Sequence, residues 1–475
     1  MDNIKIAVID NGVADELLTK TLEYKVYVDN TNHCVIDNDN MEFSGFIHGT
    51  ICAWIIENNF PECLLSSVKI LNNDGIGKID KLGGALEWCY QNNIFLVNLS
   101  LGLTHFRDKA IIRDIINHYA NRGMVIVAAT ANSGYRTYPA SFSNVIGVVA
   151  GKKIEVNYEL QKQKGIDLIA ISNYEVEIEG NNFRLDGSNS YATPYVTAMI
   201  GNILKDDPQN DVCSVRKKIL AKEELTSFLY YPDWIENAWI SEQCKRSEGK
   251  YYFNEVEGEL ETCIPMIDTI VVNSKEELKK CYDKKKHIVY LGKEPVENMI
   301  FDRFFWSREQ KIAQIISCKE RTKDIDMPLI ICKFSENQDA ILWLSVLKSC
   351  FEKDGYNVYT MSNKIEGVLY DLEFLPEELG KESAEDYVYN FLCLQTDYSQ
   401  SDAVLLGANM DFELDILESI ADMVIKINDV GKLVKMQVYC GGKLRLVNTV
   451  ESINQSAISA LYQEILNFFT EDMDE

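Results

Sequence analysis

Short apolar runs alternate with segments of helical periodicity through the first 225 residues, and this alternation limits the possible folds more than any other feature. Each run is too short for a buried helix and suits a strand that is covered on both faces. Strands that are joined by helices lie parallel, because the connection has to cross the sheet. We therefore expect an α/β region whose parallel sheet has helices on both faces. The predicted strands are Ile4–Asp10, Tyr24–Val28, Ser67–Leu71, Ile94–Leu99 and Met124–Ala129, and the predicted helices follow His48 and cover Asp80–Asn92, Lys109–Asn121 and Asp211–Lys222.

Ser190 stands just before an apolar stretch with helical spacing, among the small residues of Gly187-Ser188-Asn189-Ser190-Tyr191-Ala192. The start of a helix favours negative charge and offers free backbone N–H groups, so a serine there can be a nucleophile with an oxyanion site beside it. A serine hydroxyl also needs a base and an orienting acid. On this residue alone, a helix N-cap remains the alternative.

Asp10 and His48 are the candidates for these two groups. Asp10 ends the first predicted strand, and His48 opens a second apolar helix next to Gly49. Asp10, Ser100 and Asn132 all follow predicted strands, and the carboxyl ends of parallel strands meet at one edge of a sheet. Taken singly, Asp10 could cap a helix and Asn132 could occupy a turn. The other histidines are weaker candidates for the base: His33, His105, His118 and His287 read as loop, helix-surface or strand-entry residues.

Five segments resemble the subtilisin-like serine peptidases, in that family's order. The resemblance implies that Asp10, His48 and Ser190 form a catalytic triad, with Asn132 as the oxyanion donor. It also implies that substrate pairs as an added strand with Ser100, Leu101 and Gly102. The segments are Asp10-Asn11-Gly12-Val13, His48-Gly49-Thr50, Val97-Asn98-Leu99-Ser100-Leu101-Gly102, Val127-Ala128-Ala129-Thr130-Ala131-Asn132-Ser133-Gly134 and Asn189-Ser190-Tyr191-Ala192-Thr193-Pro194.

Four positions depart from the pattern of that family. Asn11 stands where serine or threonine is usual, and Ile51 where a second histidine is common. Ala131 and Ser188 each replace a glycine, which concerns the backbone on either side of the candidate site. None of these changes removes a group that does chemistry, so we expect an active enzyme. A protein that holds a peptide without cutting it is the alternative.

The length of 475 residues predicts two or three domains. We expect a peptidase domain over residues 1–225, an aromatic-rich connector over 226–262 and an acidic α/β accessory domain over 263–475. In the last of these, strand-like runs alternate with helical stretches, which weakly resembles nucleotide-binding-like domains that accompany peptide-maturation enzymes in bacterial natural-product systems. No glycine follows the run Pro328–Cys332, so no phosphate loop and no ATP chemistry are expected. The strand-like runs are His287–Leu291, Pro328–Cys332, Asn357–Thr360, Asp402–Leu406 and Met423–Ile427, before a hairpin at Gly441-Gly442 and a last helix over Ile453–Phe469.

The net charge of −26 is unevenly distributed along the chain. Residues 1–225 hold 28 acidic and 21 basic side chains, a net −7, whereas residues 226–475 hold 45 and 26, a net −19. An acidic second half disfavours nucleic acid and anionic membranes as partners and would suit a basic peptide, although a plain solvated surface is the simpler explanation.

The cysteines and the first residues bear on the compartment. The 13 cysteines are an odd number without a Cys-x-x-Cys pair, which favours reduced thiols over disulfides or a zinc ribbon. No apolar run reaches the length of a membrane span, and Met1-Asp2-Asn3-Ile4-Lys5 leads straight into the first strand without a signal peptide, so we expect a cytoplasmic protein.

These observations together predict an intracellular serine endopeptidase without cofactor or metal. A ribosomally made peptide precursor, whose leader is removed, is the expected substrate, and the accessory domain is expected to bind it. A general intracellular protease is the runner-up, and a non-catalytic peptide-binding protein is the alternative of another class.

Overall fold

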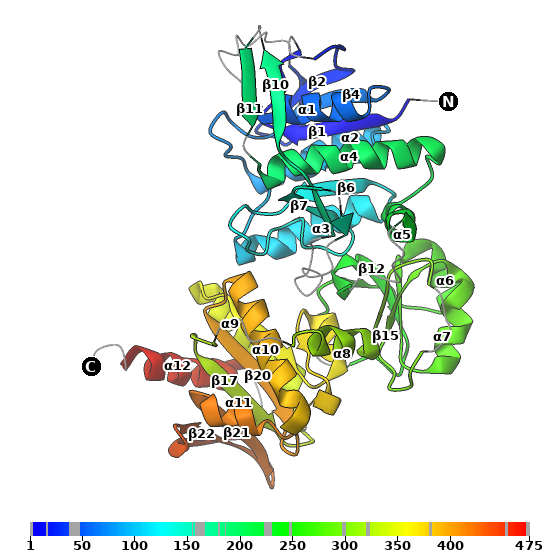
Figure 1. Cartoon of the computed structure of the whole chain (residues 1–475). Helices are drawn as coiled ribbons and strands as arrows, with labels where there is room; N and C mark the ends of the chain where they lie inside the picture. The colour runs from blue at the N-terminus through cyan, green and yellow to red at the C-terminus, as the bar shows by residue number, and fades with distance from the viewer. Residues whose placement is uncertain are drawn as a thin grey trace. The chain divides into compact units, whose positions relative to one another are not determined.

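The computed structural model describes residues 3–15, 18–37, 48–153, 155–156, 167–178, 181–185, 187–222, 230–246, 249–296, 301–319, 324–379, 382–451 and 455–471. The chain forms two compact units (Figure 1). The first comprises residues 1–236 with 302–304, and the second comprises 237–301 with 305–475. The division after Glu236 falls within 226–262, the stretch that the sequence predicts as a connector.

The first unit is built on a nine-stranded sheet in the order β3-β2-β4-β1-β5-β6-β7-β9-β8. The seven inner strands of this order, β2, β4, β1, β5, β6, β7 and β9, run parallel to one another. The two edge strands, β3 and β8, pair antiparallel with β2 and β9. The central strand β1 is buried on both faces, which is why its sequence is a continuous apolar run. The strands are β1 Lys5–Asp10, β2 Tyr24–Val28, β3 Cys34–Ile36, β4 Leu64–Lys69, β5 Leu96–Leu99, β6 Val125–Ala129, β7 Ile146–Gly151, β8 Glu155–Val156 and β9 Leu168–Ile171, and β10 Tyr174–Ile178 pairs with β11 Asn181–Leu185 as a separate hairpin.

Helices cover both faces of this sheet, as expected. Helices α2 and α3 pack into one apolar core with alternate residues of β1, β5 and β6. Helices α1 and α4 pack against each other, and α4 also contacts β5, β6, β7 and β9. The helices are α1 His48–Asn59, α2 Ile79–Gln91, α3 Lys109–Ala120, α4 Asn189–Asp206 and α5 Val212–Lys222.

Four of the five predicted strands in this unit agree with the structure to within two residues. The exception is Ser67–Leu71, because β4 begins three residues earlier, at Leu64, and pairs with β1 along its full length from Lys5 to Asp10. Strands β7 and β9 were not predicted.

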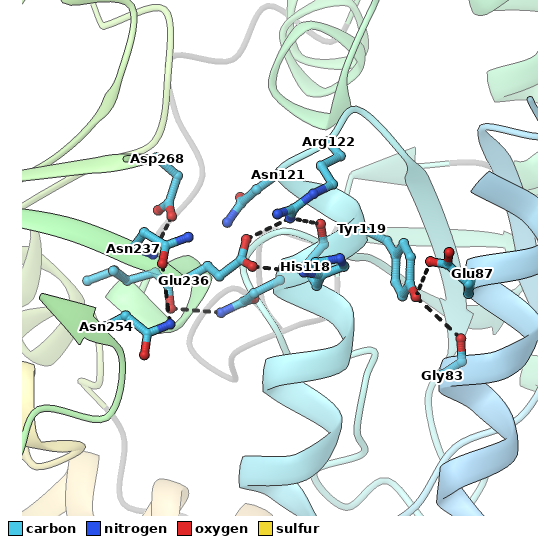
Figure 2. Close-up of polar contacts among 12 residues, drawn as sticks. Gly83, Glu87, His118, Tyr119, Asn121, Arg122, Glu236, Asn237, Asn254 and Asp268 are labelled. Atoms are coloured by element: carbon cyan, nitrogen blue, oxygen red, sulfur yellow. Dashed lines mark hydrogen bonds and ion pairs between the residues drawn. The ribbon is translucent and has the colours of Figure 1, made fainter. Parts of the chain in front are cut away.

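The last segment of the first unit, residues 230–236, is held by side chains of α3 (Figure 2). Asn117 donates to the carbonyl oxygens of Asp233 and Ile235, and Asn121 donates to that of Trp234. Glu236 accepts from Arg122 at 2.8 Å and lies 2.9 Å from Nδ1 of His118. His118 is therefore a helix-surface residue, as predicted, with a structural partner.

The second unit holds two sheets. A parallel sheet of five strands has the order β13-β12-β14-β15-β16, and a sheet of seven has the order β19-β18-β20-β17-β21-β22-β23. The first sheet consists of β12 Asn237–Ile240, β13 Asn254–Glu255, β14 Thr269–Val272, β15 His287–Tyr290 and β16 Phe305–Ser307, with α6 Leu260–Cys263 and α7 Lys275–Cys281; α8 Arg308–Ile316 follows β16 and packs into the core of the second sheet. The second consists of β17 Leu329–Phe334, β18 Val358–Ser362, β19 Glu373–Phe374, β20 Ala403–Asn409, β21 Met423–Val430, β22 Leu433–Cys440 and β23 Lys443–Val450, with α9 Ala340–Asp354, α10 Glu382–Ser399, α11 Asp415–Ile420 and α12 Gln455–Glu471.

All five strand-like runs predicted for this half correspond to strands, namely β15, β17, β18, β20 and β21. The predicted hairpin joins β22 to β23, and both of its glycines have a positive φ, 52° at Gly441 and 72° at Gly442, which the tight two-residue turn requires. The predicted connector contributes β12 and β13, so a chain that ended near residue 262 would lack the strand β14 that pairs with β12.

All 13 cysteines are free thiols, and most are buried, as the sequence predicts. In the described ranges, no helix is both long enough and apolar enough to cross a membrane.

Candidate active site

Asp10 and His48 meet at the carboxyl edge of the first sheet. Asp10 is the last residue of β1 and is 1% exposed, and His48 is the first residue of α1. One carboxylate oxygen of Asp10 accepts the N–H of Asn11 at 2.7 Å, and the other lies 2.8 Å from Nδ1 of His48. The carboxylate is therefore oriented from both sides.

Asn11 and Gly49 bring the start of α1 against the end of β1. The side-chain oxygen of Asn11 accepts the N–H of Gly49 at 3.0 Å. A Cβ on Gly49 would lie 2.4 Å from the carbonyl oxygen of Gly12, so only glycine allows this close approach. Asn11, which departs from the family pattern, thus has a definite role in placing His48.

The surroundings of His48 suit a general base. Burial lowers the pKa of its imidazole, but the hydrogen bond and the charge of Asp10 together raise it by more, so the pKa lies above its usual value. Because Nδ1–H donates to Asp10, Nε2 is left as the acceptor. The ring of His48 also stacks on Tyr191, with the centroids 5.6 Å apart.

Ser190 lies in the first turn of α4. The N-cap residue Ser188 makes no side-chain capping bond, so the first N–H groups of the helix are not taken up by it. Asn189 fastens this turn to the sheet: its side chain accepts from the N–H of Ala150 and donates to Thr130 and to the carbonyl of Ala131, at 2.8 to 3.1 Å. The nucleophile candidate therefore sits on a fixed turn.

The carbonyl oxygen of Ser190 has partners outside its own helix. Pro194, four residues on, has no N–H to donate to it. The Ser100 hydroxyl donates to this oxygen at 2.8 Å, and the Cys52 thiol approaches it at 3.7 Å. The backbone of Ser190 is thereby tied both to the end of β5 and to α1, which carries His48.

Asn132 lies three residues beyond β6 and is oriented by the same helix start. Its side-chain oxygen accepts the N–H of Asn189 at 3.0 Å. Its amide nitrogen, the donor that the predicted oxyanion role requires, has no hydrogen-bond partner within the described part of the chain.

Of the three residues predicted to pair with substrate, Ser100 is buried, whereas Leu101 and Gly102 are more accessible. Ser100 is 5% exposed, and its hydroxyl also accepts from the amide nitrogen of Asn98. The amide oxygen of Asn98 in turn accepts from Thr197 of α4 at 3.0 Å. Any contact of Ser100 with substrate would therefore come from its backbone. Leu101 is partly exposed and Gly102 is exposed.

The structure thus brings Asp10, His48, Ser190, Asn132 and Ser100 to one edge of the sheet. Between described residues, no hydrogen bond joins the Ser190 hydroxyl to His48. Such a bond is often long in a free enzyme and tightens when substrate binds.

Asp10, His48 and Cys52 are the group within the described ranges whose possible metal-ligand atoms all lie within 4.8 Å of one another. Burial, followed by the charge of Asp10, raises the pKa of the Cys52 thiol well above its usual value. A protonated thiol is a poor ligand, and Asp10 already holds His48. The donor set therefore suits a hydrogen-bonded pair better than a metal ion.

Sequence reasoning missed Asn189 and Asn98 as site residues. Asn98 lies inside an apolar strand and Asn189 directly precedes the serine, and a polar residue in such a place is the one signal that could have singled them out. Their partners come from distant elements and could not be identified from the sequence.

Ser188 and Ala131, which stand where the family has glycine, cause no backbone strain. Ser188 is extended, with φ −136° and ψ 156°, and Ala131 is not among the residues with positive φ. The N–H of Ala131 donates to Thr137 at 2.8 Å. Both positions accept a side chain without a change in backbone conformation.

Comparison with known proteins finds several that resemble part of this chain. Residues 1–230 match the model of the Subtilase family (Peptidase_S8). The chain is 30% identical over 234 residues to the Minor extracellular protease Epr of Bacillus subtilis (strain 168), a match that covers 46% of this chain and 34% of that protein. It is 29% identical over 163 residues to Subtilisin BL of Lederbergia lenta, covering 34% of this chain and 60% of that protein. The solved S41 Psychrophilic Protease is 21% identical, with a TM-score of 0.40, over 48% of this chain and 85% of that one.

Residues 1–230 are thus similar to the subtilisin-like serine peptidases. The chain spans 34% and 60% of the lengths of the two curated relatives.

Removing the Ser100 hydroxyl should weaken the start of α4. In Ser100→Ala the half-buried carbonyl of Ser190 keeps only the weak thiol donor, so we expect a loss of about 1–3 kcal/mol of stability. Hydrogen exchange of the α4 amides, followed by mass spectrometry, measures this locally in a chain with two units. Ser67→Ala is the matched control, because the buried Ser67 hydroxyl in β4 has no partner, and its removal should leave exchange unchanged or slower. Equal exchange in the two variants would contradict this role of Ser100.

The raised pKa of His48 predicts where activity is lost on the acidic side, or acidic limb, of the pH profile. A base must be neutral, so kcat/KM should rise with pH through a value above the usual histidine pKa of about 6.5. In Asp10→Asn the anion is gone while burial remains. The limb should then move to lower pH, and turnover should fall by about 10⁴ because the ring tautomer is no longer held. Measuring kcat/KM between about pH 5 and 9 tests both effects, and a limb that stays in place or moves upward would refute the assignment.

Proposed function

We propose that the protein is a serine endopeptidase that uses Ser190, His48 and Asp10. The observation that carries this proposal is the 2.8 Å contact between the buried Asp10 and His48, beside a helix start that presents Ser190. The similarity of residues 1–230 to the Subtilase family supports the same chemistry.

In the proposed mechanism, Nε2 of His48 takes the proton of the Ser190 hydroxyl as the oxygen attacks the scissile carbonyl. Asp10 holds the tautomer and stabilises the imidazolium that forms. The same imidazolium then gives its proton to the leaving amine. A water molecule repeats the sequence on the acyl-enzyme and releases the second product.

The negative charge that develops on the carbonyl oxygen needs donors. The amide nitrogen of Asn132 and the backbone N–H of Ser190, at the positive end of the α4 dipole, are the groups that we propose for this role. The backbone of Leu101 and Gly102, just past β5, is our proposal for the edge on which the peptide is added as a strand.

We propose further that the substrate is a ribosomally made precursor from which a leader is removed inside the cell. The net −19 of residues 226–475 supports a substrate with a basic segment. Contacts around the scissile bond discriminate by only about 1–3 kcal/mol per apolar group, so a second contact on the same chain would add selectivity by raising the local substrate concentration. A general protease is the runner-up, and it would show no preference for a basic segment.

Labelling with a fluorophosphonate tests whether the serine is activated at all. We expect wild type to be labelled and Ser190→Ala to be unlabelled. Ser188→Ala is a close control, because this neighbouring hydroxyl makes no capping bond, and labelling should persist in that variant. A wild-type protein that resists the probe would favour the alternative of a protein that binds peptides without cutting them.

The oxyanion role of Asn132 can be separated from its contact with Asn189. Asn132→Ala should lower kcat by about 10²–10³ with little change in KM. Asn132→Asp keeps an acceptor for the N–H of Asn189 but has no donor, so it should lose at least as much activity. Steady-state kinetics on a chromogenic peptide measures both variants, and full turnover in either would eliminate the role.

A further inference from the structure

The second unit has a point where its chain leaves two neighbouring parallel strands toward opposite faces of the seven-stranded sheet. Helix α9, which follows β17, packs against β18, β20 and α12. Helix α11, which follows β20, lies on the other face in one apolar core with α8 and α10. Strands β17 and β20 are neighbours in this sheet (Figure 1). Ligands of open α/β sheets bind outside the carboxyl ends of the strands at such a point.

A pocket of about 330 Å³ lies at this edge. Residues just past β17, β18 and β20 line it, and the backbone bonds from Met410 to Phe334 and from Asn363 to Gly407 hold these ends together. The volume is at the small end of the range of about 300–1,000 Å³ for ligand sites. It is large enough for one long side chain.

The charged groups on the pocket wall are all acidic. Glu336, Glu377 and Asp411 line it, and within the described ranges no lysine, arginine or histidine does. From the solvent side Lys293, which is 80% exposed, approaches Glu377 at 4.0 Å, a distance at which it neutralises that carboxylate weakly. The buried Lys333 in β17 pairs with Glu418 and also donates to the carbonyl oxygen of Phe412, a residue of the pocket wall. The three carboxylates on the wall therefore outnumber the two lysines near them.

Asn363 adds an acceptor that lacks a donor. Its side chain lines the pocket and is 4% exposed. The amide nitrogen donates to Glu377 at 3.5 Å. This oxygen is buried and has no hydrogen-bond partner in the described part of the chain. A buried acceptor without a partner is unfavourable, and a ligand that carries N–H groups would satisfy it.

The spacing of the acidic groups favours an organic cation over a metal ion. Glu336, Glu377 and Asp411 do not form a group whose oxygens all lie within 4.8 Å, whereas the ligands of a metal ion must surround it at about 2.0–2.6 Å. Phe334, Met410 and Phe412 supply apolar wall, which suits the aliphatic stem of a long basic side chain.

We propose that this pocket binds a basic side chain of a peptide, arginine in preference to lysine. The stem would lie along Phe412 and Met410, and the guanidinium would donate to the separate carboxylates and to the oxygen of Asn363. A planar group with five N–H donors can reach several spaced acceptors at once, which a compact ammonium cannot. A role in choosing substrates rests on the proposed peptidase function, but the binding itself does not.

Binding is tested on the full-length Ser190→Ala protein, which should leave the peptide uncut. The probe is a fluorescent, end-blocked peptide with two arginines, read by anisotropy and compared with the same peptide carrying citrulline, which has the shape of arginine without its charge. We expect the citrulline peptide to bind at least about tenfold more weakly. Equal binding of the two peptides, or no binding of either, would overturn the proposal.

Variants identify the site. Glu336→Gln and Asp411→Asn should each weaken binding of the arginine peptide by about tenfold. Glu464→Gln on α12 is the control for net charge, because Glu464 is exposed and does not line the pocket. If all three variants behave alike, the protein binds by net charge alone and the pocket is not the site.

Two further measurements show whether the ligand is a peptide and whether the pocket and the peptidase function stand or fall separately. Argininamide should compete far more weakly than the peptide, and competition at equal strength would mean that a free amine, not a peptide, is the ligand. Fluorophosphonate labelling of the wild-type protein is read independently. Labelled protein that does not bind the peptide refutes this pocket alone, and unlabelled protein that binds it refutes the peptidase function alone.

Discussion

The carbonyl oxygen of Ser190 is the point on which the geometry of the candidate site depends. Pro194 removes the helical donor that this oxygen would otherwise have, so the acceptor is free to bond outside α4. Ser100 and Cys52 take that place, one at the end of β5 and one in the helix that carries His48. Because this one N–H is missing, the backbone of Ser190 is bonded both to the end of β5 and to the helix that carries His48, and a carbonyl left unpaired there would be costly.

The remaining polar groups of the first unit extend the same arrangement. Asn98 links Ser100 to Thr197, so α4 contacts β5 through a second hydrogen-bonded chain one to two turns further on. Asn189 joins the helix start to the ends of β6 and β7 and orients Asn132. Apart from the amide nitrogen of Asn132, each of these side chains is held by hydrogen bonds within the first unit, and such bonding makes a buried polar network rigid. The proposed chemistry needs such rigidity, because donors must be in place before charge develops.

The two units use one architectural rule for different purposes. In each, side chains that are candidates for function lie at or just past the carboxyl ends of parallel strands: Asp10, Ser100 and Asn132 in the first unit, and Asn363 and Asn409 in the second. The first edge holds a polar network that is complete apart from the groups that would meet a substrate. The second holds carboxylates and an amide oxygen without enough donors, which is why a binding role is proposed for it and no chemistry.

The sequence by itself determined where the chemistry-bearing residues lie along the strands and helices of this protein. Apolar runs that end in Asp10 and in Ser100, and a helix that opens at His48, are local patterns, so the strands, the helices and the triad candidates could be predicted from them. Most of the second half's strands were predictable for the same reason. Only the tertiary structure decided the register of β4 on β1, the strands β7 and β9, the partners of Asn98 and Asn189, and the pocket around Asn363. Each of these depends on pairing between segments far apart in the chain, and the periodicity of one segment carries no information about which distant segment will satisfy its polar groups.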